Sequence, residues 1–276
     1  MSSIERAMER MRRAPAAGAV DVTAAQMSEP EPAPASDPAV ALDLAALREL
    51  GMLTPDADQR ALQEQYRLVK RQLLARAFRP APDGGNPVNL IQITSALASE
   101  GKTFTAFNLA ISVAMEVDFT VLLVDADLTR RGLTHLIGLQ GRPGITELLA
   151  GEVGDVGSIV TRTDIPRLSV IPAGQGHPRS TELVASDAMR RLSREVTTRY
   201  HDRLVIVDST PLLMDSQAAT LAAHVGQIVV VVEASRTAEM PLRNAIALLD
   251  PATADVGLLL NKSMARRRSS YYDDAS

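Results

Sequence analysis

Residues 90–131 read LIQITSALASEGKTFTAFNLAISVAMEVDFTVLLVDADLTRR, and this stretch decides the fold of the chain. An apolar run leads into a loop of small residues, then into Gly101-Lys102-Thr103, an apolar helical segment, a second apolar run and Asp125-Ala126-Asp127. A loop between a strand and a helix presents consecutive backbone N–H groups, which bind phosphate oxygens together with the helix N-terminus. The stretch therefore predicts a phosphate-binding loop that faces two aspartates.

The residue types in this loop suit a nucleotide and a metal ion. Lys102 would place a positive charge on the outer phosphates, and the Thr103 hydroxyl is a candidate Mg²⁺ ligand. The usual pattern is Gly-x-x-x-x-Gly-Lys-Ser/Thr, but Ala96 occupies the position of its first glycine. On the loop alone, a plain strand-to-helix turn with an exposed lysine therefore stays open.

Three aspartates favour the metal–nucleotide interpretation. Asp125 and Asp127 follow an apolar run and are two residues apart, so their side chains share one side of a strand. Two such carboxylates repel each other unless a cation lies near them. Asp208 follows the apolar run 204–207, where P-loop enzymes carry a magnesium carboxylate. Together with Gly-Lys-Thr the aspartates predict an ATP–Mg²⁺ site, although a turn or helix cap remains open for Asp125 or Asp127 taken alone.

Two polar residues, Asn261 and Lys262, follow the last apolar run. The Asn261 amide could hydrogen-bond the adenine, and the Lys262 stem could cover the base; a plain strand cap is the alternative. The residues expected to contact the nucleotide are Ala98, Ser99, Glu100, Gly101, Lys102, Thr103, Phe104, Asn261 and Lys262.

Short apolar runs alternate with helical segments from Val88 onwards, which predicts an α/β fold with a doubly wound, mostly parallel sheet flanked by helices. Several runs are apolar on both faces, as buried parallel strands are. The expected strands are 88–94, 120–124, 168–171, 203–207, 227–232 and 256–260. The expected helices are 42–50, about 54–78, 102–116, 181–199, 216–223 and 240–249.

The bulk properties exclude several classes of protein. The chain has 276 residues, a net charge of −4 and no cysteine. The charge argues against a general nucleic-acid-binding surface, and the lack of cysteine excludes disulfides and thiolate metal sites. No apolar run is long enough to span a membrane, and residues 1–13 lack the apolar core of a signal peptide. We expect a cytoplasmic protein that reaches the inner membrane only through a partner.

Composition divides the chain into five parts. At the start of the chain, Ile4, Ala7 and Met11 are spaced so that they share one face of a helix, with charged residues on the opposite face. A cluster of prolines follows. The expected parts are a short helix at 1–13, a disordered Ala/Pro-rich linker at 14–40, a helical extension with a hinge at 41–87, a P-loop domain at 88–264 and a mobile tail at 265–276.

At this point the chain resembles the bacterial tyrosine kinases, P-loop autokinases of polysaccharide export, and within them the exosortase-associated autokinases of exopolysaccharide export. The resemblance covers all but the Ala/Pro linker. Its specific pieces are Thr94-Ser95-Ala96, Glu100-Gly101-Lys102-Thr103, Val124-Asp125-Ala126-Asp127, Ile171-Pro172-Ala173-Gly174, Thr181-Glu182-Leu183 and Val207-Asp208-Ser209. It implies a P-loop NTPase of the deviant Walker type, in which alanine often replaces the first loop glycine.

The resemblance also implies roles for the site residues. Lys102 would stabilise charge on the transferred phosphoryl group, and Asp125 would accept or orient the substrate tyrosine hydroxyl. Thr103, Asp127 and Asp208 would hold Mg²⁺ directly or through water. Most of the catalysis would then come from positioning and charge stabilisation.

The family implies an assembly as well. Tyr271 and Tyr272 resemble its C-terminal tyrosine cluster and would be phosphorylated by a neighbouring subunit. Glu64, Arg67 and Lys70 match the helix face that joins subunits into a ring. The expected activator is a membrane-embedded protein of the chain-length-determinant type, and no nucleic-acid partner is expected.

One departure from the family is Ser99, which replaces a glycine of the phosphate loop. If that position needs φ > 0, serine would cost on the order of 1 kcal/mol and loosen the loop. Two alternatives to a kinase remain. A partition or positioning ATPase would carry an early loop lysine where Leu97 stands, and a nucleotide-binding scaffold would bind without catalysis.

Overall fold

The computed structural model describes residues 39–79, 85–198, 203–250 and 254–263. They contain a seven-stranded sheet in the order β3-β4-β2-β5-β1-β6-β7. All neighbouring strands are parallel except the antiparallel pair β3–β4. The strands are β1 (Leu90–Ser95), β2 (Thr120–Asp125), β3 (Thr161–Arg162), β4 (Leu168–Ile171), β5 (Arg203–Asp208), β6 (Gln227–Glu233) and β7 (Asp255–Asn261). The predicted fold class is confirmed.

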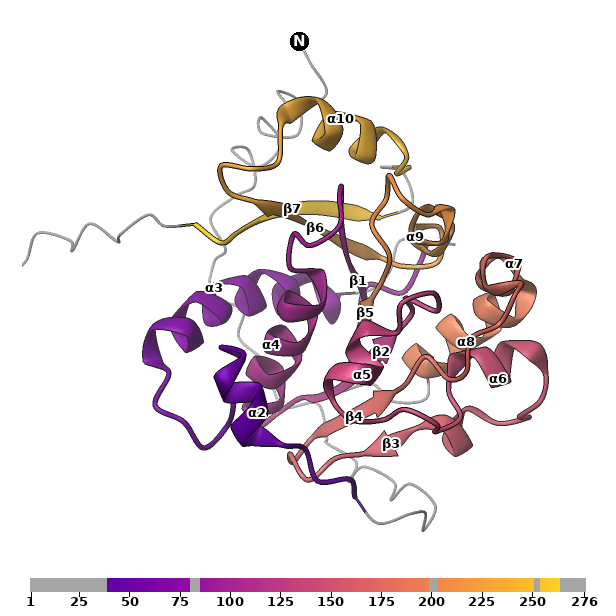
Figure 1. Cartoon of the computed structure of the whole chain (residues 1–276), viewed down its shortest axis with the longest axis horizontal. Coiled ribbons are helices and arrows are strands. Elements are labelled where there is room, and N and C mark those ends of the chain that lie inside the picture. Colours follow the sequence, from indigo (N-terminus) through magenta and orange to yellow (C-terminus); the bar gives the residue numbers. More distant parts are fainter. Residues whose placement is uncertain (1–38, 80–84, 199–202, 251–253, 264–276) are drawn as a thin grey trace, which may run out of the picture. The chain divides into compact units, whose positions relative to one another are not determined.

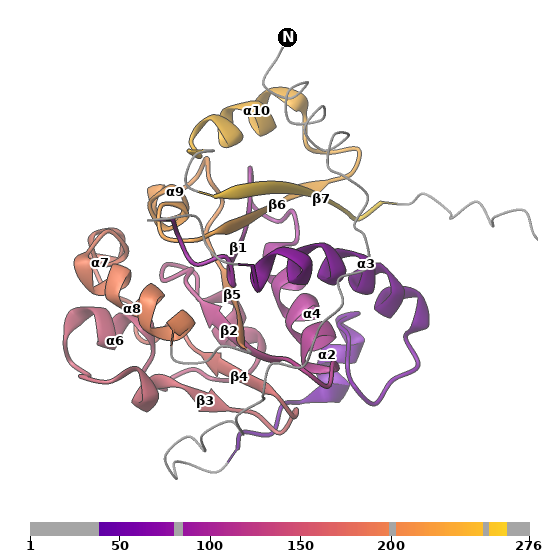
Figure 2. The same ribbon diagram turned by 180° about the vertical axis from the view of Figure 1, so that it is seen from behind.

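Helices cover both faces of this sheet (Figures 1 and 2). One face packs against α2 (Leu44–Glu49), α3 (Arg60–Ala77), α4 (Lys102–Ala114) and α5 (Gly132–Leu136). The other packs against α6 (Ile145–Ala150), α7 (Ser180–Val184), α8 (Asp187–Thr198), α9 (Ser216–Ala222) and α10 (Glu239–Ala247), with a 3-10 turn, η1, at Val156–Ile159. β5 is buried from Leu204 to Asp208, which explains why residues 204–207 read as a continuous apolar run.

Two predicted helices have different boundaries in the structure. The helix expected from residue 54 begins only at Arg60. Before it, the Gln59 side chain holds a turn by donating to the Met52 carbonyl and accepting from the Thr54 N–H. The helix expected at 181–199 is two helices, because the Ser186 hydroxyl donates to the Leu183 carbonyl and interrupts the ladder. Short side chains that hydrogen-bond the backbone compete with the helix in this way.

The described part of the helical extension belongs to the same compact unit as the sheet. The Leu53 N–H, for example, donates to Asn108 Oδ1 of α4 at 2.6 Å. In α3 an apolar stripe, which includes Tyr66 and Leu73, packs into the core. The extension is therefore integral to the fold.

Lys70 corrects one expectation about α3. It was placed on the exposed face with Glu64 and Arg67, but its side chain is 6% exposed. Its ammonium group donates to the Ser112 carbonyl at 2.8 Å and forms an ion pair with Glu116. Lys70 lies four residues after Tyr66, so helical geometry turns it toward α4. Glu64 and Arg67 do pair with each other at 2.7 Å on the outside.

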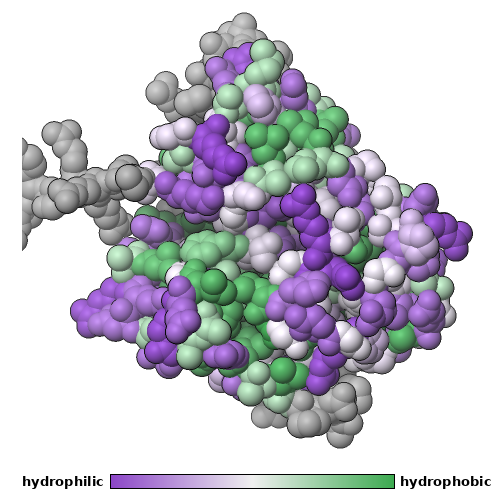
Figure 3. Space-filling model, in the orientation of Figure 1, coloured by the Kyte–Doolittle hydropathy of each residue, from purple (hydrophilic) through white to green (hydrophobic). Residues whose placement is uncertain are grey.

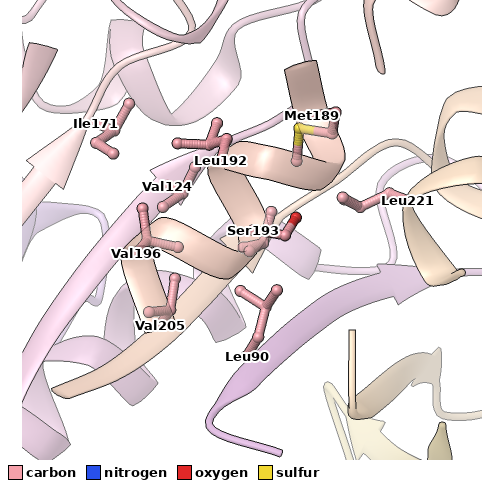
Figure 4. A pocket seen from close by; sticks show the side chains of 10 residues that line it. Leu90, Val124, Ile171, Met189, Leu192, Ser193, Val196, Val205 and Leu221 are labelled. Atoms are coloured by element: carbon pink, nitrogen blue, oxygen red, sulfur yellow. The ribbon is translucent and has the colours of Figure 1, made fainter. Parts of the chain in front are cut away.

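A void of about 10 Å³ lies beneath α8, where Met189, Leu192, Ser193 and Val196 face the sheet (Figure 4). It is apolar and roughly one water in size. Figure 3 shows apolar areas over α4 and α10, and Met240 of α10 is 67% exposed. Among the described residues, none of the helices combines the length and apolar character that crossing a membrane requires.

Several predictions fall outside the described residues. They are the N-terminal helix at 1–13, nearly all of the linker at 14–40, part of the hinge, and the tail with Tyr271 and Tyr272.

Candidate functional site

The candidate site lies at the carboxyl ends of β1, β2 and β5, where open parallel sheets bind their ligands. The register pairs Asp125 with Asp208 on neighbouring strands, and the Ala126 N–H donates to the Asp208 carbonyl at 2.8 Å. Thr103 belongs to the first turn of α4, which follows β1 through the phosphate loop. Elements that are far apart in the sequence therefore meet at one edge.

The central contact joins the phosphate loop to β5. The Thr103 hydroxyl donates to Asp208 Oδ2 at 2.6 Å. Asp208 is 1% exposed, and its Oδ1 has no hydrogen-bond partner among the described residues. Lys102 is buried at the first position of α4, and its charge acts on Asp208. A buried carboxylate oxygen without a donor is costly unless another group binds it.

The electrostatics of the aspartates favours binding of a cation. Burial raises the pKa of Asp208 to about 8, with Asp125 and Asp127 adding repulsion and Thr103 and Lys102 opposing the shift. Burial also raises the pKa of Asp125 to about 6, against the hydrogen bonds from Thr134. Carboxylates in these surroundings become stable as anions when a positive ion lies beside them.

Asp125 and Asp127 are held by backbone donors. Asp125 Oδ1 accepts from the Asp127 N–H at 3.2 Å, and Asp127 Oδ1 accepts from the Arg130 N–H at 2.9 Å. Asp125 Oδ2 accepts from the N–H and the hydroxyl of Thr134 at 2.8 and 2.7 Å. Thr134 was not predicted as a site residue, because a threonine in a short helix gives no signal of its own in the sequence.

The phosphate loop requires left-handed backbone at two positions. Ser99 has φ 66° and Gly101 has φ 98°. A Cβ on Gly101 would lie 2.1 Å from Asn261 Nδ2, so only glycine fits there. Ser99 has no such freedom, and the expected strain at this position is present in the structure. Ala98 is half-buried and Ser99 exposed, while Phe104 packs at the edge of the core.

The end of β7 braces this loop from outside. The Asn261 amide donates to the Glu100 carbonyl at 2.9 Å, and the Lys262 ammonium donates to the Ser99 carbonyl at 2.7 Å. Lys262 also pairs with Glu233 at 3.1 Å. Both side chains thus contact the loop backbone, which makes them loop supports as well as candidates for the adenine.

Glu100 also supports the phosphate loop, a role that the sequence pattern did not predict. Its carboxylate is 2% exposed. One oxygen accepts from the Leu97 N–H at 2.7 Å and the other from the Thr237 hydroxyl. Glu100 therefore ties the loop to Thr237, in the segment after β6.

The residues present fit a magnesium–nucleotide site. Among the described residues, no group of three His, Cys, Asp or Glu side chains has the spacing of a self-sufficient metal site. Mg²⁺ usually keeps several waters and takes one or two protein ligands plus phosphate oxygens. The Thr103–Asp208 pair with its free Oδ1 offers such a partial ligand set.

Comparison with known proteins places the chain among kinases, although no family model matches it. It is 33% identical over 187 residues to the tyrosine-protein kinase Wzc of Salmonella typhi, covering 67% of this chain and 25% of that protein. The chain thus spans about a quarter of the length of this curated relative.

Solved structures agree. The kinase domain of the Escherichia coli tyrosine kinase Etk is 30% identical with a TM-score of 0.55, covering 66% of this chain and 72% of that one. The cell division ATPase MinD of Pyrococcus furiosus has a TM-score of 0.53 at 20% identity, with 62% and 70% covered, which shows a shared fold alone. The narrower exosortase-associated assignment stays a prediction. The chain belongs to the bacterial tyrosine kinase family.

Proposed function

We propose that this chain is a protein-tyrosine kinase that transfers the γ-phosphoryl group of ATP, with Mg²⁺, to tyrosine hydroxyls. Family membership supports the reaction class. The observation that carries the proposal is the part-buried Thr103–Asp208 hydrogen bond at 2.6 Å, which lies beside a buried Asp208 oxygen without a partner among the described residues. This pair sits at the N-terminus of α4, where phosphate groups bind.

Each site residue has a distinct task in this proposal. When bound, ATP–Mg²⁺ supplies the phosphoryl group and the positive charge that the aspartates lack. Thr103, Asp127 and Asp208 would hold the ion, directly or through water. Lys102 places its charge where negative charge accumulates on the phosphoryl oxygens. Asp125 holds the tyrosine hydroxyl in place and receives its proton.

The proposal is tested by incubating the full chain with ATP and Mg²⁺ and locating phosphotyrosine by mass spectrometry. We expect phosphotyrosine in the wild type and none in Asp208→Asn, which keeps the shape of the side chain. Consumption of ATP without phosphotyrosine would favour a positioning-type ATPase switch. Neither consumption nor phosphotyrosine would favour a nucleotide-binding scaffold.

The proposed acceptors are Tyr271 and Tyr272 of a neighbouring subunit. A short tail reaches a neighbour's site more easily than its own, and phosphate would then repel the tail from the aspartates. The double variant Tyr271→Phe/Tyr272→Phe should lose most of the phosphotyrosine, whereas the control Tyr200→Phe should keep it. Full labelling of the double variant would refute these acceptors.

The proposed assembly is a ring-like homo-oligomer that binds a membrane-embedded activator of the chain-length-determinant type. The protein would thus lie at the inner membrane through its partner and regulate exopolysaccharide polymerisation and export. The exposed Glu64–Arg67 pair supports a subunit contact through α3, and exposed apolar residues such as Met240 offer a contact surface. Mass photometry of Arg67→Ala beside the control Arg71→Ala tests the ring, since only the former should dissociate it.

A further inference from the structure

We propose that Thr134 is a positioning residue that decides which oxygen of Asp125 faces the reacting tyrosine. The inference rests on the proposed function, in which Asp125 receives the hydroxyl proton. The contact joins Thr134 in the short helix α5 to Asp125 at the end of β2. The role of α5 in this inference is to hold Thr134 against Asp125.

The contacts of Asp125 divide its two oxygens unequally. Oδ2 accepts two hydrogen bonds from Thr134, from the N–H at 2.8 Å and from the hydroxyl at 2.7 Å. Oδ1 accepts one longer bond from the Asp127 N–H at 3.2 Å. A carboxylate oxygen can accept about two hydrogen bonds. Both acceptor positions of Oδ2 are therefore occupied, whereas one acceptor position of Oδ1 remains. Only Oδ1 can therefore receive a further hydrogen bond without breaking one.

The direction of the Thr134 hydroxyl is fixed by its second partner. The Ala173 N–H donates to Thr134 Oγ1 at 2.9 Å. The hydroxyl oxygen is thus an acceptor toward Ala173, and its own hydrogen must point at Asp125. Thr134 is 2% exposed, so water cannot replace either bond. These two hydrogen bonds form a relay with one direction of donation, from the Ala173 N–H to the Thr134 hydroxyl and from that hydroxyl to Asp125.

The far end of this relay is rigid. The Thr146 N–H and hydroxyl donate to the Ala173 carbonyl at 3.1 and 2.7 Å. Glu147 accepts from the N–H groups of Gly144 and Gln175 at 2.7 and 2.8 Å. The loop after β4 is therefore bound to α6 on both sides of Ala173. The hydrogen bonds of Thr134 to Asp125 and Ala173, and of Thr146 to Ala173, are all buried. These buried hydrogen bonds hold Thr134 against Asp125.

Loss of the hydroxyl should change the reaction more than the binding of ATP. Without it, Oδ2 regains a free position, the Asp125 side chain can rotate, and both oxygens compete for the tyrosine hydroxyl. Misplacing a catalytic group by about 1 Å costs up to about 100-fold in rate. ATP binding depends on the phosphate loop, which Thr134 does not touch.

The experiment compares Thr134→Val, which removes the hydroxyl at constant shape, with Thr134→Ser, which keeps it. The full chain is assayed with ATP–Mg²⁺ and a Glu/Tyr copolymer as acceptor. We expect kcat to fall by at least about 10-fold in Thr134→Val, with KM for ATP unchanged, and to recover in Thr134→Ser. Thr163→Val is the matched control outside the relay: the Thr163 hydroxyl donates to the Leu168 carbonyl and accepts from the Ile165 N–H, and Thr163 is 8% exposed.

Crystal structures of the Val and Ser variants without nucleotide give a readout that is independent of activity. The Asp125 carboxylate should be rotated in Thr134→Val and native in Thr134→Ser. A native Asp125 rotamer in Thr134→Val, or a kcat within about 2-fold of Thr163→Val, would overturn the inference. Absence of phosphotyrosine in the wild type would instead refute the proposed function, and the crystal structures would still decide the positioning of Asp125.

Discussion

Replacing Ser99 by glycine should stabilise the protein. Ser99 has φ 66°, and left-handed backbone costs a residue with a Cβ about 1–2 kcal/mol. Glycine escapes this cost but gains about 0.5–1 kcal/mol of unfavourable entropy on folding. The Ser99 side chain is exposed, so little packing is lost. The net gain is about 0.5–1 kcal/mol, which urea denaturation would register as a rise of the midpoint by about 0.3 M.

Two controls separate backbone strain from other effects of the change. Ser99→Ala removes the hydroxyl but keeps the Cβ, so its midpoint should match that of the wild type. Gly101→Ala should destabilise strongly, because its Cβ would meet Asn261 Nδ2 at 2.1 Å. Equal stabilisation by Ser99→Ala and Ser99→Gly would refute the assignment of the strain to φ, and so would a lower midpoint for Ser99→Gly.

The remaining predictions concern charge and packing. The pKa values of Asp125 and Asp208 are raised from 3.8 to about 6 and about 8, so between roughly pH 4 and 8 the folded state holds more protons than the unfolded state. Without a divalent ion the free energy of unfolding, measured by urea melts, should therefore fall as the pH rises through this window. Addition of Mg²⁺ or the change Asp208→Asn should make this pH dependence weaker. A free energy of unfolding that does not change with pH in the wild type without Mg²⁺ would contradict the raised pKa values. Lys70→Met should lower the free energy of unfolding by about 2 kcal/mol, because a buried donor is lost while Glu116 is 43% exposed. Arg67→Met, which breaks an exposed pair, should cost at most about 0.5 kcal/mol, and equal costs would show that Lys70 is not buried in solution. Ser193→Ala should leave stability unchanged or raise it by up to about 1 kcal/mol in the same melts, since its buried hydroxyl has no partner among the described residues; a clear loss would mean that the hydroxyl is bonded.

Much of the sheet was predictable because buried parallel strands are apolar on both faces. The predicted strand at 168–171 matches β4, and five others differ by one or two residues at either end. β3 was missed, since a two-residue strand has no periodicity to detect. α5 and α6 were also missed, because five or six residues are too few to show a helical stripe.

The site was only partly predictable. The aspartates at strand ends were found because their signal is local: an apolar run followed by a carboxylate. Thr134 was not found, because a threonine in a short helix has no signal of its own in the sequence. The brace made by Glu100 was not found because its partner Thr237 is 137 positions away. Lys70 was misplaced for a different reason. A charged residue is normally solvated, and the cation was buried only because α4 supplies a carbonyl and Glu116.

The sequence by itself determined the alternation of strands and helices, the phosphate loop between β1 and α4, and the identity of the residues that carry charge. These features follow from short-range patterns of burial and backbone geometry. The tertiary structure decided which of those residues meet. Thr103 and Asp208 are 105 positions apart and share a 2.6 Å hydrogen bond, because parallel strands β1 and β5 lie side by side and bring their carboxyl ends to one edge. Strand order is set by packing across the whole sheet, and no local pattern encodes it.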